Sequence, residues 1–167
     1  MRLLTPLLLS GLALTAAACA PVAAPPPSLL VPGYTAAPIA NYDWHLHTEG
    51  EDASLAYGLR DSDDLRLGLN CQRGSGQLAL SAVGDAGTVP EISLESGGEA
   101  ALYPATAEAS ELVDGVILSA TAPAAAPVFQ RFQSLGWLAH RQADDIHPYV
   151  AHPGSTARIA RFFAFCG

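Results

Sequence analysis

Apolar and polar residues alternate along several stretches of the chain, which is the pattern of β-strands with one buried face. The clearest stretch is "DDLRLGLNCQ", where Leu65, Leu67, Leu69 and Cys71 take every second position. After the turn "RGSG" the alternation resumes in "QLALSAV", so the two segments predict an antiparallel hairpin. Further strands are predicted at "YDWHLHT", "SLAYGL", "EISLES", "ALYPATA", "VILSATA", "WLAHRQ" and "PYVAH", with the polar segment "ADDIH" joining the last two.

Two other segments have the period of a helix. In "AAAPVFQRFQSLG" the apolar face is formed by Val128, Phe129, Phe132 and Leu135. In "GSTARIARFFAFCG" the apolar face is formed by Ile159, Phe162, Phe163 and Cys166, after a capping Ser155 or Thr156. The pattern therefore predicts an α+β fold, an antiparallel β-sheet of about seven to nine short strands with two packed helices.

The first 18 residues have the parts of a secretory signal. A single Arg2 is followed by the uncharged run "LLTPLLLSGLALTAAA". This run is shorter than the roughly 20 residues that a membrane-spanning helix needs. We therefore expect residues 1–18 to direct export and then to be removed.

The site of cleavage decides the role of the first cysteine. Cleavage after Ala20 would place Pro21 at the new N-terminus, where the rigid ring is rejected by an ordinary signal peptidase. Cleavage after Ala18 would instead expose Cys19. The segment "TAAAC" resembles the lipobox of bacterial lipoproteins, although that family most often has leucine where this chain has Ala16.

This resemblance implies a diacylglyceryl thioether on Cys19 and an acylated amino terminus. Several acyl chains hold a protein on a membrane far better than one, because each buried methylene adds about 0.8 kcal/mol. Ala20 rather than aspartate follows the cysteine, which in this family implies the outer membrane, with the protein facing the periplasm. Plain secretion, with Cys19 lost or idle, is the alternative.

The cysteine count is consistent with a lipid anchor. Three cysteines in an exported chain leave one unpaired, and a modified Cys19 leaves Cys71 and Cys166 as an even pair. Cys71 lies on the inward face of a predicted strand and Cys166 ends the inward face of a predicted helix. A Cys71–Cys166 disulfide is therefore predicted.

Residues 19–40 separate this anchor from the folded part. Residues 20–40 contain six prolines, which exclude a helix or a central strand and indicate a semi-rigid, Pro/Ala-rich tether. The predicted organisation is a signal peptide at 1–18, a lipidated tether at 19–40 and one globular α+β domain at 41–167.

The chain is acidic, with 16 Asp and Glu against 8 Lys and Arg, a net charge of −8. Such a surface repels phosphate backbones, so nucleic acid is not an expected partner. The acidic clusters "EGED" and "DSDD" are expected to be solvated loops, and neither matches a Ca²⁺-binding loop.

Histidine is the only residue type arranged in a candidate metal-binding pattern. His45 and His47 fall on one face of a predicted strand, about 7 Å apart, a spacing that allows two imidazoles to share Cu²⁺ or Zn²⁺. The sequence assigns no third ligand, so the alternative is that both histidines form a solvent-exposed face, with Trp44 and Leu46 turned to the core.

The sequence contains no recognised catalytic motif, such as G-x-S-x-G, H-E-x-x-H or a Walker loop. A non-catalytic envelope module is therefore the leading hypothesis, held at the membrane by its anchor and binding another envelope protein or cell-wall material. The alternative is a periplasmic lipoprotein that binds a metal or small ligand through His45 and His47.

Overall fold

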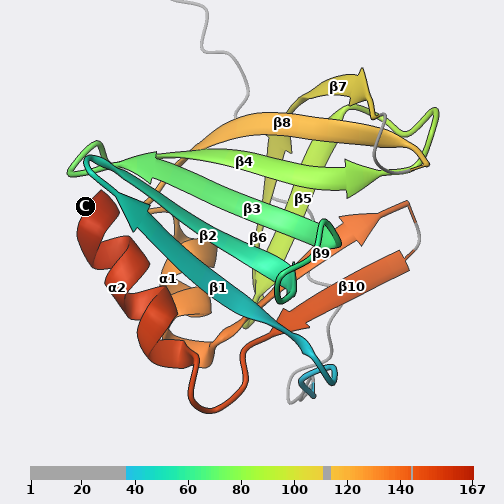
Figure 1. The fold of residues 1–167 in the computed structure, drawn as a ribbon. Coiled ribbons are helices and arrows are strands. Elements are labelled where there is room, and N and C mark those ends of the chain that lie inside the picture. The colour runs from blue at the N-terminus through green and yellow to red at the C-terminus, as the bar shows by residue number, and fades with distance from the viewer. Residues whose placement is uncertain (1–36, 111–113, 144) are drawn as a thin grey trace, which may run out of the picture.

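A computed structural model describes residues 37–110, 114–143 and 145–167. The described chain contains ten strands and two helices (Figure 1). In chain order they are β1 Tyr42–Glu49, β2 Asp52–Leu59, β3 Leu65–Gln72, β4 Gln77–Gly84, β5 Glu91–Ser96, β6 Glu99–Pro104, β7 Thr106–Ala109, β8 Val116–Pro123, α1 Pro127–Leu135, β9 Trp137–Gln142, β10 Asp145–Val150 and α2 Thr156–Cys166. The predicted combination of antiparallel β-structure with two helices is confirmed.

The described strands divide into two sheets, where the sequence predicted one. The larger sheet has the order β1-β2-β3-β4-β8-β7 and the smaller one β10-β9-β5-β6. Five of the strands are eight residues long, so the expectation of short strands holds only for the remainder. Alternation fixes which face of a strand is buried but not which sheet the strand joins, and this is why the division was not predicted.

Two boundaries differ from the prediction. The segment expected as one strand, "ALYPATA", is divided into β6 and β7, which belong to different sheets. The division falls at Pro104, which has no N–H to continue a ladder. The connection "ADDIH" is shorter than expected, because Asp145 already pairs with Gln142 and begins β10.

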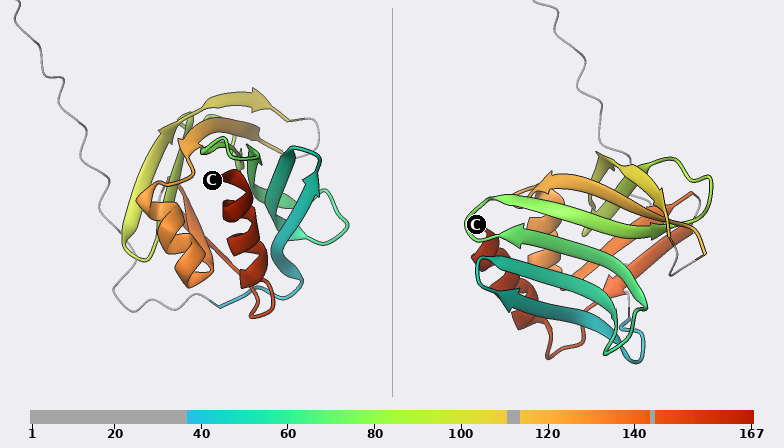
Figure 2. Two further views of the ribbon diagram at one scale, coloured as in Figure 1. Left: turned by 90° about the vertical axis from the view of Figure 1, so that its left-hand side faces the viewer. Right: turned by 45° about the horizontal axis from the view of Figure 1, so that its top comes forward.

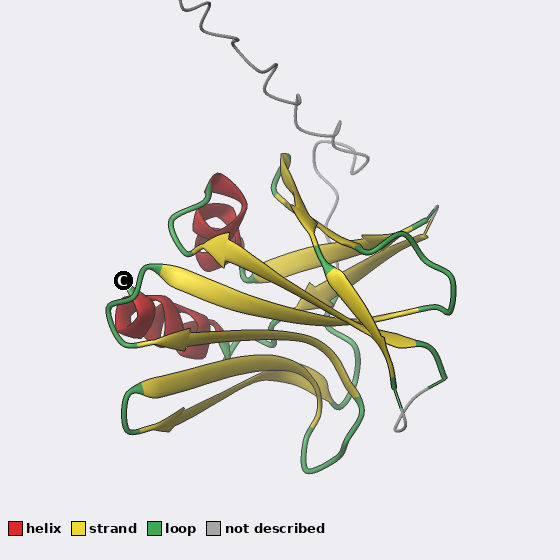
Figure 3. Cartoon of the chain, turned by 90° about the horizontal axis from the view of Figure 1, so that it is seen from above, coloured by secondary structure: helices red, strands yellow, loops and turns green. Residues whose placement is uncertain are grey.

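The two sheets enclose a shared core. They contact each other where β8 lies against β5 and β6, and again where β1 lies against β10. Helix α1 packs on β5, β6 and β9, and α2 packs on β1, β2 and β3 (Figure 2). Both helices lie toward the same end of the strands (Figure 3). The core between the sheets and helices is aromatic, with the Trp44 and Phe132 rings 4.7 Å apart.

Most of the predicted inward residues are buried, and two are not. Val128, Phe129 and Phe132 of α1 are at most 1% exposed, but Leu135 is 47% exposed. Leu135 belongs to the last turn of α1, and its side chain lies over Gly97 in the β5–β6 turn rather than over the sheet. Leu65 is 46% exposed because it begins β3, next to the register shift at Tyr57/Gly58.

The N-terminal end of α2 is attached to β1 by the carboxylate of Asp43. Asp43 accepts hydrogen bonds from the Ser155 hydroxyl and from Arg158 Nη1, the latter at 3.0 Å, and from two backbone N–H groups. Ser155 is the N-cap residue, one of the two candidates from the sequence. Its hydroxyl donates to Asp43 and accepts from Arg158 Nη1 at 3.1 Å, and it does not cap a backbone N–H of its own helix. The carboxylate also lies where the helix dipole favours negative charge.

These contacts control the ionisation of Asp43. Burial by itself would raise its pKa, but the hydrogen bonds from Ser155 and from the Trp44 and His152 N–H groups, with the Arg158 charge, outweigh burial. The net effect is a lowered pKa, so the ionised form stabilises the fold.

The C-terminal end of α2 is attached to β3 by the Cys71–Cys166 disulfide, as predicted. Cys71 is 7% exposed and Cys166 is fully buried. The β3–β4 turn adds two backbone hydrogen bonds, from Gly74 N to Phe165 O at 3.0 Å and from Gly76 N to Cys166 O at 2.8 Å. Helix α2 is thus attached to the larger sheet at both ends.

The disulfide should contribute strongly to stability, because it joins residues 95 positions apart. We expect the Cys71→Ala/Cys166→Ala variant of the full chain to lose about 4 kcal/mol of unfolding free energy, measured by urea denaturation. A reductant should destabilise the natural protein to a similar extent and leave the variant unchanged. Free thiols at both positions in mass spectrometry without reductant would contradict the pairing.

The Asp43 contacts should make stability depend on pH. Because the pKa of Asp43 is lowered in the folded state, its contribution is complete above the unfolded value of about 4 and is lost as pH falls through the folded value. Asp43→Asn should therefore cost about 1–2 kcal/mol of unfolding free energy at pH 7, and progressively less below about pH 4. The control Asp63→Asn, on an exposed turn, should change the unfolding free energy little. If Asp43→Asn lost as much unfolding free energy in the acidic range as at neutral pH, this prediction would be contradicted.

Candidate functional site

The structure places the predicted site residues in different parts of the molecule. Cys19 and the rest of the lipobox-like segment lie outside the described residues. Cys71 and Cys166 form the disulfide under the end of the larger sheet. His45 and His47 are both on β1, and their side chains lie on the outer face of that sheet, opposite to the fully buried Trp44.

The two histidines have few partners. His45 Nε2 lies 3.3 Å from the Gly58 carbonyl oxygen, and His47 Nε2 lies 3.8 Å from a carboxylate oxygen of the exposed Glu49. Within the described ranges, no three His, Cys, Asp or Glu residues are grouped to hold a metal ion. Two other histidines, His140 and His147, face each other across β9 and β10 in the smaller sheet.

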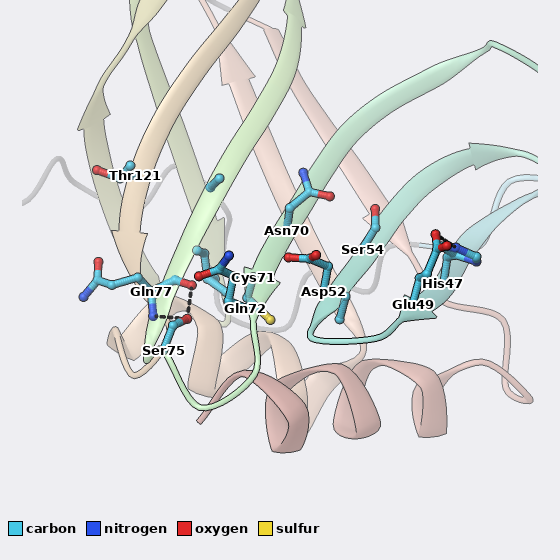
Figure 4. A pocket seen from close by; sticks show the side chains of 13 residues that line it. His47, Glu49, Asp52, Ser54, Asn70, Cys71, Gln72, Ser75, Gln77 and Thr121 are labelled. Carbon is cyan, nitrogen blue, oxygen red and sulfur yellow. Dashed lines mark hydrogen bonds and ion pairs between the residues drawn. The ribbon is translucent and has the colours of Figure 1, made fainter.

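His47 instead forms one end of a polar groove on the larger sheet. Pairing between neighbouring strands aligns one residue from each of five strands in a continuous row. The row runs across β1, β2, β3, β4 and β8 as His47, Ser54, Asn70, Ala79 and Thr121. A second row beside it contains Glu49, Asp52, Gln72 and Gln77. Together these residues line a groove of about 560 Å³ (Figure 4).

Most of the side chains that line the groove are polar, although most of the surface that the groove exposes is apolar. They lie on the outer face because each alternates with a buried residue, as Asn70 does between Leu69 and Cys71. The amide groups of Asn70, Gln72 and Gln77 make no side-chain hydrogen bond to another described residue, and all three side chains are exposed. The groove can therefore offer both kinds of hydrogen-bonding group to a ligand.

The floor of the groove is held rigidly. Cys71, Leu78 and Ala53 lie beneath it, and the disulfide joins this floor to α2. At the nearby β3–β4 turn, the Arg73 guanidinium lies 4.0 Å from the centre of the Phe165 ring and 3.4 Å from a Glu51 carboxylate oxygen. Rigid placement of polar groups lowers the entropy that a ligand must lose on binding.

The groove does not have the arrangement of a hydrolase. Its hydroxyl groups belong to Ser54, Ser75 and Thr121, and the Ser75 hydroxyl donates to the Gln77 backbone carbonyl at 3.2 Å. His47 contacts Glu49 and not a hydroxyl group, so no described groove residue forms a nucleophile–base pair.

Sequence reasoning found His47 but missed the rest of the groove. Asn70 and Gln72 were predicted to face away from the core, so their exposure was available from alternation. The alignment of Asn70 with Thr121 was not available, because it depends on the pairing of β4 with β8, which follows a long connection through the smaller sheet.

Comparison with protein-family models, with curated proteins and with solved structures found no match. Within the described ranges, neither helix combines the length and apolar character needed to cross a membrane.

Proposed function

We propose that this chain is an exported, lipid-anchored envelope protein that acts as a non-catalytic binding module and holds cell-wall glycan in the polar groove. The observation that carries the proposal is a set of amide and hydroxyl groups without a partner among the described residues, above a floor that the disulfide joins to α2: those of Ser54, Asn70, Gln72 and Thr121. The lipobox-like segment at Cys19 and the proline-rich tether support the location, in the outer membrane and facing the periplasm.

A glycan fits this chemistry better than a protein partner does. Sugar chains present closely spaced hydroxyl groups, each a donor and an acceptor, and side-chain amides such as Asn70 and Gln72 complement both. Interfaces with proteins usually centre on large aromatic or Arg side chains. Among the described residues, no Phe, Tyr, Trp or Arg side chain lines the groove.

The charge of the groove narrows the class of glycan. Glu49 and Asp52 are exposed at one end, and no Lys or Arg of the described ranges lines the groove. A strongly anionic polysaccharide would be repelled. We therefore expect a neutral or amine-bearing glycan chain.

Groove binding is tested with purified cell-wall sacculi and the full chain carrying Cys19→Ala, which removes the anchoring thiol. The protein should sediment with the sacculi. Asn70→Leu and Gln72→Leu should each weaken binding about fivefold or more, because each removes hydrogen bonds worth about 1 kcal/mol. Gln133→Leu makes the same chemical change on the exposed face of α1 and should bind normally.

Unchanged sedimentation of both groove variants would contradict the assignment of the groove. Absence of sedimentation, with capture of a single envelope protein by crosslinking in cells, would favour the protein partner instead.

The anchor is tested separately. Cys19→Ala should move the protein from the membrane fraction to the soluble envelope extract, because the acyl chains have no other site of attachment. The Cys71→Ala/Cys166→Ala variant keeps Cys19 and should remain in the membrane fraction. Unchanged fractionation of Cys19→Ala would count against lipidation.

A further inference from the structure

A second cavity, of about 780 Å³, lies at the end of the sheets away from the two helices. It is bounded by the chain before β1, the β2–β3 turn, the loop after β4, Asp114 and strands β9 and β10. Its volume is in the range of sites for small molecules. It is distinct from the polar groove, with which it shares no lining residue.

One wall of this cavity is aromatic. The rings of Tyr42 and Tyr57 are stacked with centres 6.0 Å apart, and the rings of Tyr57 and Tyr149 are 4.8 Å apart. Burial raises the pKa of both Tyr57 and Tyr149, so they remain neutral phenols. The face of Tyr42 already carries a cation, since the Arg66 guanidinium lies 5.9 Å from its ring centre.

The rim of the cavity is acidic. Asp64 is neutralised by Arg66, with Nε and Oδ1 2.8 Å apart. Three other carboxylates, those of Asp85, Asp114 and Asp145, are exposed at the rim and have no ion-pair partner among the described residues. The rim thus carries negative charge that the described protein does not compensate.

A buried histidine lies next to this cavity. His140 on β9 pairs with His147 on β10, and His147 lines the cavity. The His140 side chain is fully buried, and neither of its ring nitrogens has a hydrogen-bond partner among the described residues. Burial, with a smaller effect of His147, lowers its pKa to about 4, so it is neutral and adds no positive charge. A buried polar group without a partner is costly, but His140 is not among the described residues that line the cavity, so it is not a ligand contact there.

We infer that this cavity binds a small organic cation, an amine whose ammonium group lies among the rim carboxylates and whose apolar part lies against the tyrosines. An anion would be repelled by the rim, and a neutral ligand would leave the carboxylates uncompensated. A metal ion is not favoured, because the described side chains provide no group of three ligands. The inference is independent of the proposed glycan groove at the other end of the molecule.

Three probes of similar shape separate charge from apolar contact: phenethylamine, 2-phenylethanol and 3-phenylpropionate. They are titrated into the ¹⁵N-labelled full chain carrying Cys19→Ala, and binding is followed by NMR. Phenethylamine should shift the amide signals of Tyr42, Asp64 and His147. The alcohol should bind at least about tenfold more weakly, and the carboxylate should not bind.

Substitution at the rim tests the site. Asp85→Asn and Asp145→Asn should each raise the Kd for phenethylamine about threefold to tenfold, because each removes one exposed charge. Asp52→Asn, in the groove, should leave the Kd unchanged. Equal affinity for the amine and the alcohol, shifts confined to the groove, or no saturable shift with any probe would overturn the inference.

Discussion

Attachment of α2 to the larger sheet at both ends is the constraint on which the rest of the structure depends. The N-terminal end is held by Asp43, which links β1 to Ser155 and Arg158, and the C-terminal end by the Cys71–Cys166 disulfide. Between these points Ile159, Phe162 and Phe163 are buried in the core. The N-terminal attachment depends on ionisation of the Asp43 carboxyl group, and the C-terminal attachment depends on oxidation of the Cys71 and Cys166 thiols. The folded state is therefore suited to oxidising conditions near neutral pH.

The two helices also give the ends of the molecule different chemistry. At the end where the Cys71–Cys166 disulfide joins α2 to β3, the helices cover the core, and the outer face of the strands forms the groove. At the other end no described helix covers the core, and a cavity opens between the sheets, with Tyr149 within it and Asp145 at its rim. A rigid hydrogen-bonding surface suits an extended chain with many hydroxyl groups, and an acidic aromatic cavity suits a compact cation.

The histidines illustrate how position along a strand differs from position in space. His45 and His47 are adjacent on one face of β1, as their spacing predicted, but the described residues around them provide no third metal ligand. His140 and His147 are seven positions apart in the sequence, and the register of β9 and β10 makes them neighbours. His140 is buried although it is polar, and it lies beside the cavity. Neither of its ring nitrogens has a hydrogen-bond partner among the described residues.

Local pattern by itself determined most of the elements. Alternation located the strands of the larger sheet, and the helical faces located α1 and α2. The inward positions of Cys71 and Cys166 predicted their pairing. Each inward position could be inferred because it follows from the residues next to that cysteine in the sequence. Tertiary structure alone decided the division into two sheets, the exposure of Leu135, and the arrangement of rim carboxylates from four separate parts of the chain. These features depend on which distant strands pair and how the sheets pack, and such contacts leave no periodic trace in the sequence.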